Sequence, residues 1–132
     1  MTYERSARRR IAASVLLAAA SIAGAASAQA QRCDSRPAQS HFAREDLRRA
    51  VSEGDLVTAQ DFSDRARREL EQLASIALRC GCAPAQSGFE AAAAQAHQAR
   101  DAETRRELRD TVNETIRLFD AAMLALRRCA KI

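Results

Sequence analysis

Two cysteines separated by a single glycine, Cys80-Gly81-Cys82, divide the part of this chain after its first thirty residues into two segments of matched length. Cys33 lies 47 residues before Cys80, and Cys129 lies 47 residues after Cys82. In an exported chain, an even number of cysteines is typical of a disulfide framework. The matched spacing favours the bridges Cys33–Cys80 and Cys82–Cys129. It leaves open Cys33–Cys82 with Cys80–Cys129, and also a Cys80–Cys82 bridge.

The first thirty residues have the three parts of a secretory signal. A basic start is carried by Arg5, Arg8, Arg9 and Arg10. An uncharged apolar run follows from Ile11 to Ala26, which is short of the ~20 residues that a membrane span needs. Small-residue patterns then predict cleavage after Ala28 or Ala30. We therefore expect a signal peptide at 1–30 and no membrane span in the mature chain, which would be periplasmic or secreted from a Gram-negative bacterium.

The leader also explains the positive charge of the whole chain. The sequence has 21 basic and 17 acidic side chains. The leader holds four of the arginines and the single acid Glu4, so 17 basic and 16 acidic side chains remain after cleavage. A net charge near zero gives no reason to expect nucleic-acid binding.

Helical periodicity runs through most of the mature chain, which we expect to form a single all-α domain at 31–132. Apolar residues recur every three or four positions from Ser40 to Glu53, from Leu56 to Cys80, and again toward Cys129. Helices with one apolar stripe must bury it against one another. We therefore predict a small disulfide-stapled bundle of two stacked helical hairpins, with three or four helices.

Turn and cap residues predict where these helices begin and end. Ser40 is expected to cap the first helix, and Gly54 to close it in a left-handed conformation before Asp55 caps the second. A capping box at Ser87 predicts that a third helix begins near Gly88. Near Asp101 no glycine is present, and we expect a break or kink there.

The two cysteine-bracketed segments, 33–80 and 82–129, also align in their apolar positions. When Cys33 is placed on Cys82, Leu70 falls on Phe119 and Ala77 falls on Leu126. This agreement predicts an internal duplication. The alternative is that two ordinary amphipathic helices share a cysteine spacing by coincidence.

One turn resembles a known helical repeat. Gly54-Asp55-Leu56, followed by Ala59 and Ala66, resembles the turn and second helix of a tetratricopeptide repeat. The resemblance covers only Gly54 to Ala66 and implies a helix-turn-helix hairpin. We carry no peptide-binding function over from it.

The cysteine pair also allows two functions besides structural bridging. A disulfide between Cys80 and Cys82 would be strained and oxidising, which suits thiol exchange. The same thiols with His41 could bind a soft ion such as Cu(I). We name no catalytic or cofactor-binding residue, because neither His41 nor His97 lies near a nucleophile in the expected fold.

We therefore expect a non-enzymatic protein-interaction or small scaffold module that binds another protein of the cell envelope. Its candidate interaction face lies in the alanine-rich stretch of the third helix, at Ala92, Ala93, Ala96 and Ala99. Small side chains there would let a partner backbone approach closely. The alternative is that these alanines pack against the first hairpin. The cysteines Cys33, Cys80, Cys82 and Cys129 are expected to be structural.

Overall fold

A computed structural model describes residues 32–131 of the chain. The expected signal peptide and its cleavage sites lie outside these residues. The elements, in order, are α1 (Ala38–Ser52), α2 (Leu56–Arg79), α3 (Ala83–Gln98), the short 3-10 turn η2 (Ala99–Asp101) and α4 (Arg105–Ala130). The expected all-α fold class is confirmed for the described residues, which contain four α-helices.

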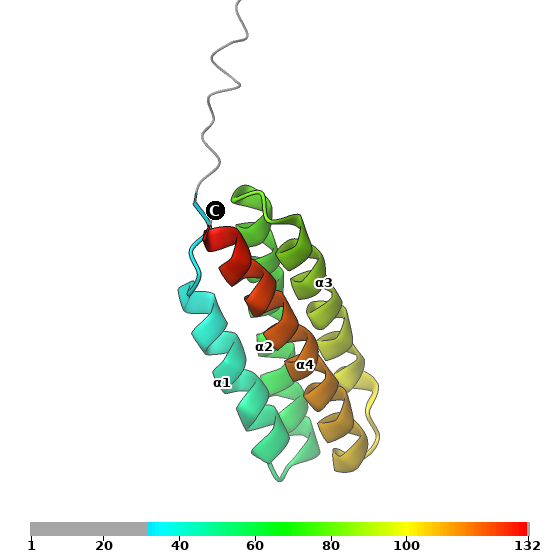
Figure 1. The fold of residues 1–132 in the computed structure, drawn as a ribbon. Helices are drawn as coiled ribbons and strands as arrows, with labels where there is room; N and C mark the ends of the chain where they lie inside the picture. Colours follow the sequence, from blue (N-terminus) through cyan, green and yellow to red (C-terminus); the bar gives the residue numbers. More distant parts are fainter. Residues whose placement is uncertain (1–31, 132) are drawn as a thin grey trace, which may run out of the picture.

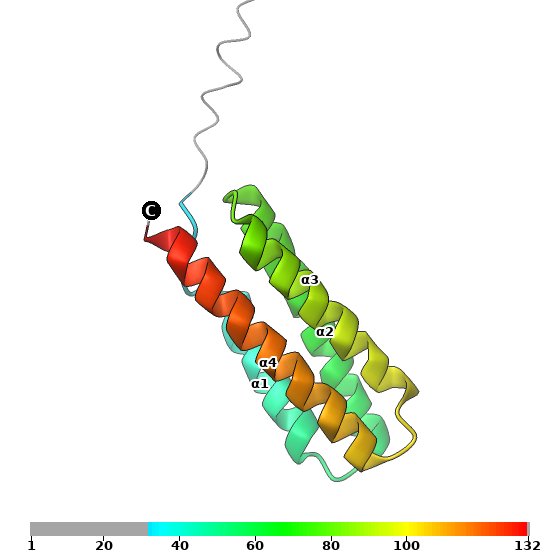
Figure 2. The ribbon, with the colours of Figure 1, turned by 45° about the vertical axis from the view of Figure 1, so that its right-hand side comes forward.

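The four helices run alternately down and up the molecule (Figure 1). Each helix packs closely on the next along the chain: α1 on α2, α2 on α3, and α3 on α4. The first and last helices also lie side by side, but they pack less closely than these sequential pairs (Figures 1 and 2). The bundle therefore has one looser side, between α1 and α4.

The caps at the two ends of α2 follow from its flanking residues. Asp55 caps its start, where the side chain accepts a hydrogen bond from the Thr58 backbone N–H at 3.0 Å. At its end Gly81 has φ +75°, the left-handed conformation that glycine tolerates best. The Cys82 N–H donates to the Ala77 carbonyl at 2.9 Å, and the Gly81 N–H to the Leu78 carbonyl at 3.1 Å. These two bonds form a Schellman motif, which turns the chain sharply into α3.

Two predicted helix starts and one predicted backbone conformation are wrong. Ser40 lies inside α1, which begins at Ala38, and the Ser40 hydroxyl donates to the Pro37 carbonyl at 2.6 Å. Gly54 does not adopt a left-handed conformation. α3 begins at Ala83 and not near Gly88, because proline is well accommodated in a first helical turn and Pro84 lies there.

The expected break near Asp101 is confirmed. α3 ends at Gln98, η2 follows, and Ala102 is extended with φ −65° and ψ 129°. Thr104 then caps α4, since its hydroxyl accepts from the Glu107 N–H at 3.1 Å. The break therefore needs no glycine, because a new cap starts the next helix.

The core is made mainly of alanine and leucine around two aromatic rings. Phe89 of α3 and Phe119 of α4 are fully buried, and their ring centroids lie 6.3 Å apart. Beside them, a Cβ atom added to Gly88 would lie 2.8 Å from the Cβ of Ala122. The backbones of α3 and α4 therefore approach each other as closely as small residues allow.

The two cysteine-bracketed segments contain helices of similar lengths. The first has helices of 15 and 24 residues, and the second has helices of 16 and 26 residues. Whether they arose by duplication stays a prediction. Within residues 32–131, no helix combines the length and the apolar character that crossing a bilayer requires.

Candidate functional site

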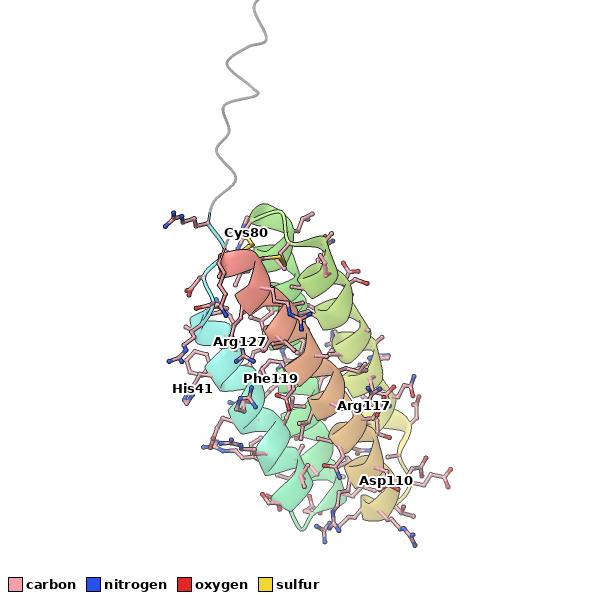
Figure 3. The ribbon with its side chains drawn as sticks, viewed as in Figure 1. His41, Cys80, Asp110, Arg117, Phe119 and Arg127 are labelled. Carbon is pink, nitrogen blue, oxygen red and sulfur yellow. A yellow bond between two sulfur atoms is a disulfide. The ribbon has the colours of Figure 1, made fainter. Side chains whose placement is uncertain are left out.

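The four cysteines gather at one end of the bundle, where the structure joins them in two bridges (Figure 3). Cys33 is bonded to Cys80 and Cys82 to Cys129, with Cα–Cα distances of 5.1 Å and 5.9 Å. Among the alternatives that the spacing left open, this is the pairing that it favoured. Each bridge links the start of one segment to its own end, and Gly81 separates the two bridges.

This pairing limits what the Cys80-Gly81-Cys82 stretch can do chemically. The two cysteines belong to different bridges, and no cysteine in the described part of the chain is free. A sulfur in a disulfide is not a thiolate, so it can neither attack a disulfide nor ligate copper until its bridge is reduced. In Figure 3 His41 lies on α1, away from the end of the bundle where Cys80 lies. Within residues 32–131, no three potential metal ligands are placed so that they could hold an ion together.

The prediction of an exposed interaction face in the alanine-rich stretch of α3 and η2 is wrong. The exposed fractions of its four alanines are 0% for Ala92, 5% for Ala93, 0% for Ala96 and 0% for Ala99. A partner could not reach them without opening the bundle. These alanines pack inside the protein, as the alternative interpretation expected.

Polar side chains of α2 show why this face is internal. The buried Ser63 hydroxyl donates to the Ala96 carbonyl at 3.2 Å. The Gln60 amide lies 3.1–3.2 Å from the carbonyl oxygens of Ala99, Arg100 and Ala102, in the turn that follows α3. The small alanines thus allow a close approach, but the helix that approaches is α2 of the same chain.

A pair of carboxyl groups lies between α1 and α2. Asp46 is 3% exposed, and one of its oxygens is 3.6 Å from the Arg65 guanidinium. Its other oxygen, Oδ2, and Oε2 of Glu69 are buried without a hydrogen-bond partner among the described residues when both groups are ionised. A proton held between the two carboxyls would supply the missing hydrogen bond.

The energetics favour such a shared proton. The pKa of Glu69 is raised to about 7, mainly because the carboxyl group is partly buried. The neighbouring charge of Asp46 and a hydrogen bond to Asp46 raise this pKa further. Arg65 and Arg68 oppose this rise, because their positive charges favour the ionised carboxylate. The pair lines an open groove together with the more exposed His41, Phe42, Glu45, Arg49 and Arg65.

The α1–α4 seam is a second hollow, on the looser side of the bundle. It is a pocket of about 180 Å³ lined by Arg44, Leu47, Arg48, Ile116 and Phe119. Leu47 and Phe119 are fully buried and form its floor, whereas Arg48 is exposed at its rim. The Arg44 guanidinium lies 4.8 Å from the centre of the Phe119 ring and 3.0 Å from an oxygen of Asp120. Arg44 is therefore held as one wall of the pocket.

The sequence interpretation missed both hollows, although a signal was present for the first. Asp46 lies three residues from Ala43 and four from Ala50, so it falls on the buried side of the first helix. A carboxylate at such a position predicts a buried partner. The α1–α4 seam had no comparable signal, because its existence depends on how closely the first and last helices meet.

Comparisons with protein-family models, with curated proteins and with solved structures found no match to this chain.

Proposed function

We propose that this chain is an exported, non-enzymatic protein-interaction or small scaffold module of a bacterial cell envelope. The proposal takes residues 1–30 as a signal peptide that is removed after Ala28 or Ala30. It takes residues 31–132 as a single domain built of two stacked helical hairpins. The basic, apolar and small-residue sections of the leader support export. The two disulfides support it as well, because such bridges persist in oxidising compartments.

The observation that carries the proposal is the α1–α4 seam. The three sequential helix pairs pack closely, whereas α1 and α4 pack loosely, and a pocket with an apolar floor and arginine at its rim lies between them. An apolar centre surrounded by polar groups is the usual composition of a protein-interaction site. Here the half-buried Ile116 supplies the apolar surface that a partner can reach, above the fully buried Leu47 and Phe119. We therefore place the partner on α1 and α4.

The disulfides favour binding through a preformed surface. Both bridges tie the ends of long segments together, so the bundle reaches its binding shape before any partner arrives. Association then costs little ordering of the domain itself. A small protein with only alanine and leucine in most of its core gains such rigidity from its bridges more than from its packing.

Crosslinking from defined positions tests this function. A photoreactive amino acid is introduced singly at one exposed site on each helix, Arg48, Gln72, Ala94 or Arg117, in the full chain with its leader, expressed in the native host. We expect irradiation to give a discrete adduct from Arg48 and little from the other three positions. If no position on any helix gives an adduct, the protein does not act through a protein partner and the proposal fails.

A further inference from the structure

We propose that the α1–α4 seam binds an acidic segment of a partner protein, and that this segment inserts one aromatic or branched aliphatic side chain as an anchor. The inference rests on the proposed function and names the chemistry of the partner. It combines three features of the seam: the size of its pocket, the arginines at its rim, and the half-buried Ile116 above the buried Leu47 and Phe119.

The pocket has room for one apolar side chain. Its volume is about 180 Å³, and the half-buried Ile116 offers the apolar surface that an inserted side chain would contact, above the fully buried Leu47 and Phe119. For comparison of size, an enclosed apolar cavity of ~150 Å³ is large enough to hold benzene. An aromatic or branched aliphatic side chain therefore fits, whereas a lipid acyl chain needs a longer cavity.

Two arginines at the rim favour a carboxylate next to that anchor. Arg44 is fixed by its contacts with Phe119 and Asp120, and a guanidinium has five N–H donors, so Arg44 can donate hydrogen bonds to a second carboxylate as well. Within residues 32–131, no carboxylate oxygen lies within ion-pair distance of Arg48. Arg48 is exposed, so its charge is available to a partner.

The positive charge continues along α4. Arg109 lies seven residues before Ile116, and Arg127 lies seven residues after Asp120, so both share the side of α4 that carries the seam. Figure 3 places Arg127 beside α1. Asp120, whose carboxylate pairs with Arg44, lies on the same side of α4. The mature chain is nearly neutral as a whole, so this row of arginines is a local concentration of charge that would steer an acidic partner to the seam.

The other candidate occupants fit less well. The leader of this chain is itself basic and would be repelled. A second copy related by two-fold symmetry would set the arginine rim against its own counterpart, which is unfavourable. A flat anionic membrane could reach the arginines, but its acyl chains are too long for a pocket of about 180 Å³.

A displayed library of random 12-residue peptides tests the inference, with the oxidised mature protein recovered from the periplasm as the target. We expect the selected peptides to be enriched in Asp and Glu around a Phe, Leu or Ile. Their affinity should fall as the salt concentration rises from about 50 to about 500 mM, because exposed charges are then screened. Arg48→Glu should weaken binding by about tenfold or more. The matched control Arg117→Glu, on another side of α4, should leave it unchanged, and circular dichroism should show both variants folded.

The inference is overturned if the library yields no enriched peptides, if the enriched peptides lack acidic residues, or if Arg48→Glu binds them as well as the native protein does. Stronger retention on anionic vesicles than on the peptides would also overturn it. These results differ from failure of the proposed function. If photocrosslinks form from Gln72 or Ala94 and the peptides show no acidic consensus, the protein is an interaction module whose binding site lies elsewhere. If no helix gives a crosslink, both the proposed function and this inference fail.

Discussion

Asp46 and Glu69 place two carboxyl groups in contact between α1 and α2, and this makes the stability of the protein depend on pH. The unfolded chain releases the Glu69 proton near its ordinary pKa of 4.5, whereas the folded chain holds it until about pH 7. Between these values the folded state binds more protons. The stabilisation is therefore complete below about pH 4.5 and is lost as the pH rises through about 7.

Replacing Glu69 with glutamine should remove this dependence. The glutamine amide can donate to Asp46 Oδ2 at any pH, as the protonated carboxyl does only at low pH. We expect Glu69→Gln to be more stable than the native protein at pH 8 by about 1 kcal/mol, a value reduced for solvent screening of a half-buried group. At pH 5 the two proteins should have about equal stability. Urea unfolding followed by circular dichroism at both pH values measures the difference.

Glu71→Gln is the matched control, because Glu71 is an exposed carboxylate on the same helix, paired with Arg67. We expect this variant to keep the pH dependence of the native protein. If Glu69→Gln also keeps it, the two carboxyls do not share a proton and our interpretation of the pair is wrong.

At the scale of the helices, the stripes of α2 and α4 were predictable because leucine and phenylalanine identify a buried side without ambiguity. The buried side of α3 was not predictable, because alanine is compatible with a core face, an exposed face and an interface. The deciding information was the position of α2, whose Ser63 and Gln60 bind the carbonyls of the alanine face. The start of α3 was misplaced for a local reason: Ser87 and Glu90 match a capping box, but Pro84 already begins the helix upstream.

The close approach of α3 to α4 gives a prediction at this scale. Gly88→Ala adds a Cβ atom 2.8 Å from the Ala122 side chain, which has no flexible end that could move away. The gain in helix propensity of about 1 kcal/mol is then outweighed by overpacking, which costs about 1–3 kcal/mol. We expect a net loss of about 1 kcal/mol in the free energy of unfolding.

Gly54→Ala provides the comparison, because nothing lies within 4 Å of its added Cβ and its φ is not left-handed. We expect this variant to match the native protein to within about 0.5 kcal/mol. A Gly88→Ala protein that is more stable than the native one would mean that α3 and α4 are farther apart than described here.

At the scale of the whole molecule, two bridges at one end hold a bundle that has little aromatic core. Each bridge spans 47 residues of sequence. In the chain-entropy model a loop of this length contributes about 4 kcal/mol. The double variants Cys33→Ala/Cys80→Ala and Cys82→Ala/Cys129→Ala should therefore lose similar amounts of stability in urea. If one of them unfolds at the native midpoint, its bridge does not stabilise the fold.

The bridges were predictable from cysteine spacing, whereas the α1–α4 seam was not, because spacing along the chain does not specify how two helices at opposite ends of it meet. The charge of the seam was hidden for a similar reason. Arg44 and Arg48 lie far from Arg109 and Arg127 in sequence, and the nearly neutral total conceals their grouping on one side of the bundle. Only the folded arrangement brings them together.

We infer an exported module that is held together by two disulfides. Its most direct test is non-reducing peptide mapping by mass spectrometry, applied to the protein purified from its own cell envelope. We predict a mature chain that begins at Gln29 or Gln31, with Cys33 linked to Cys80 and Cys82 linked to Cys129. A retained leader together with four free thiols would contradict both export and the formation of the two disulfides. A Cys80–Cys82 bridge would instead indicate thiol exchange at the stretch where the two halves of the chain meet.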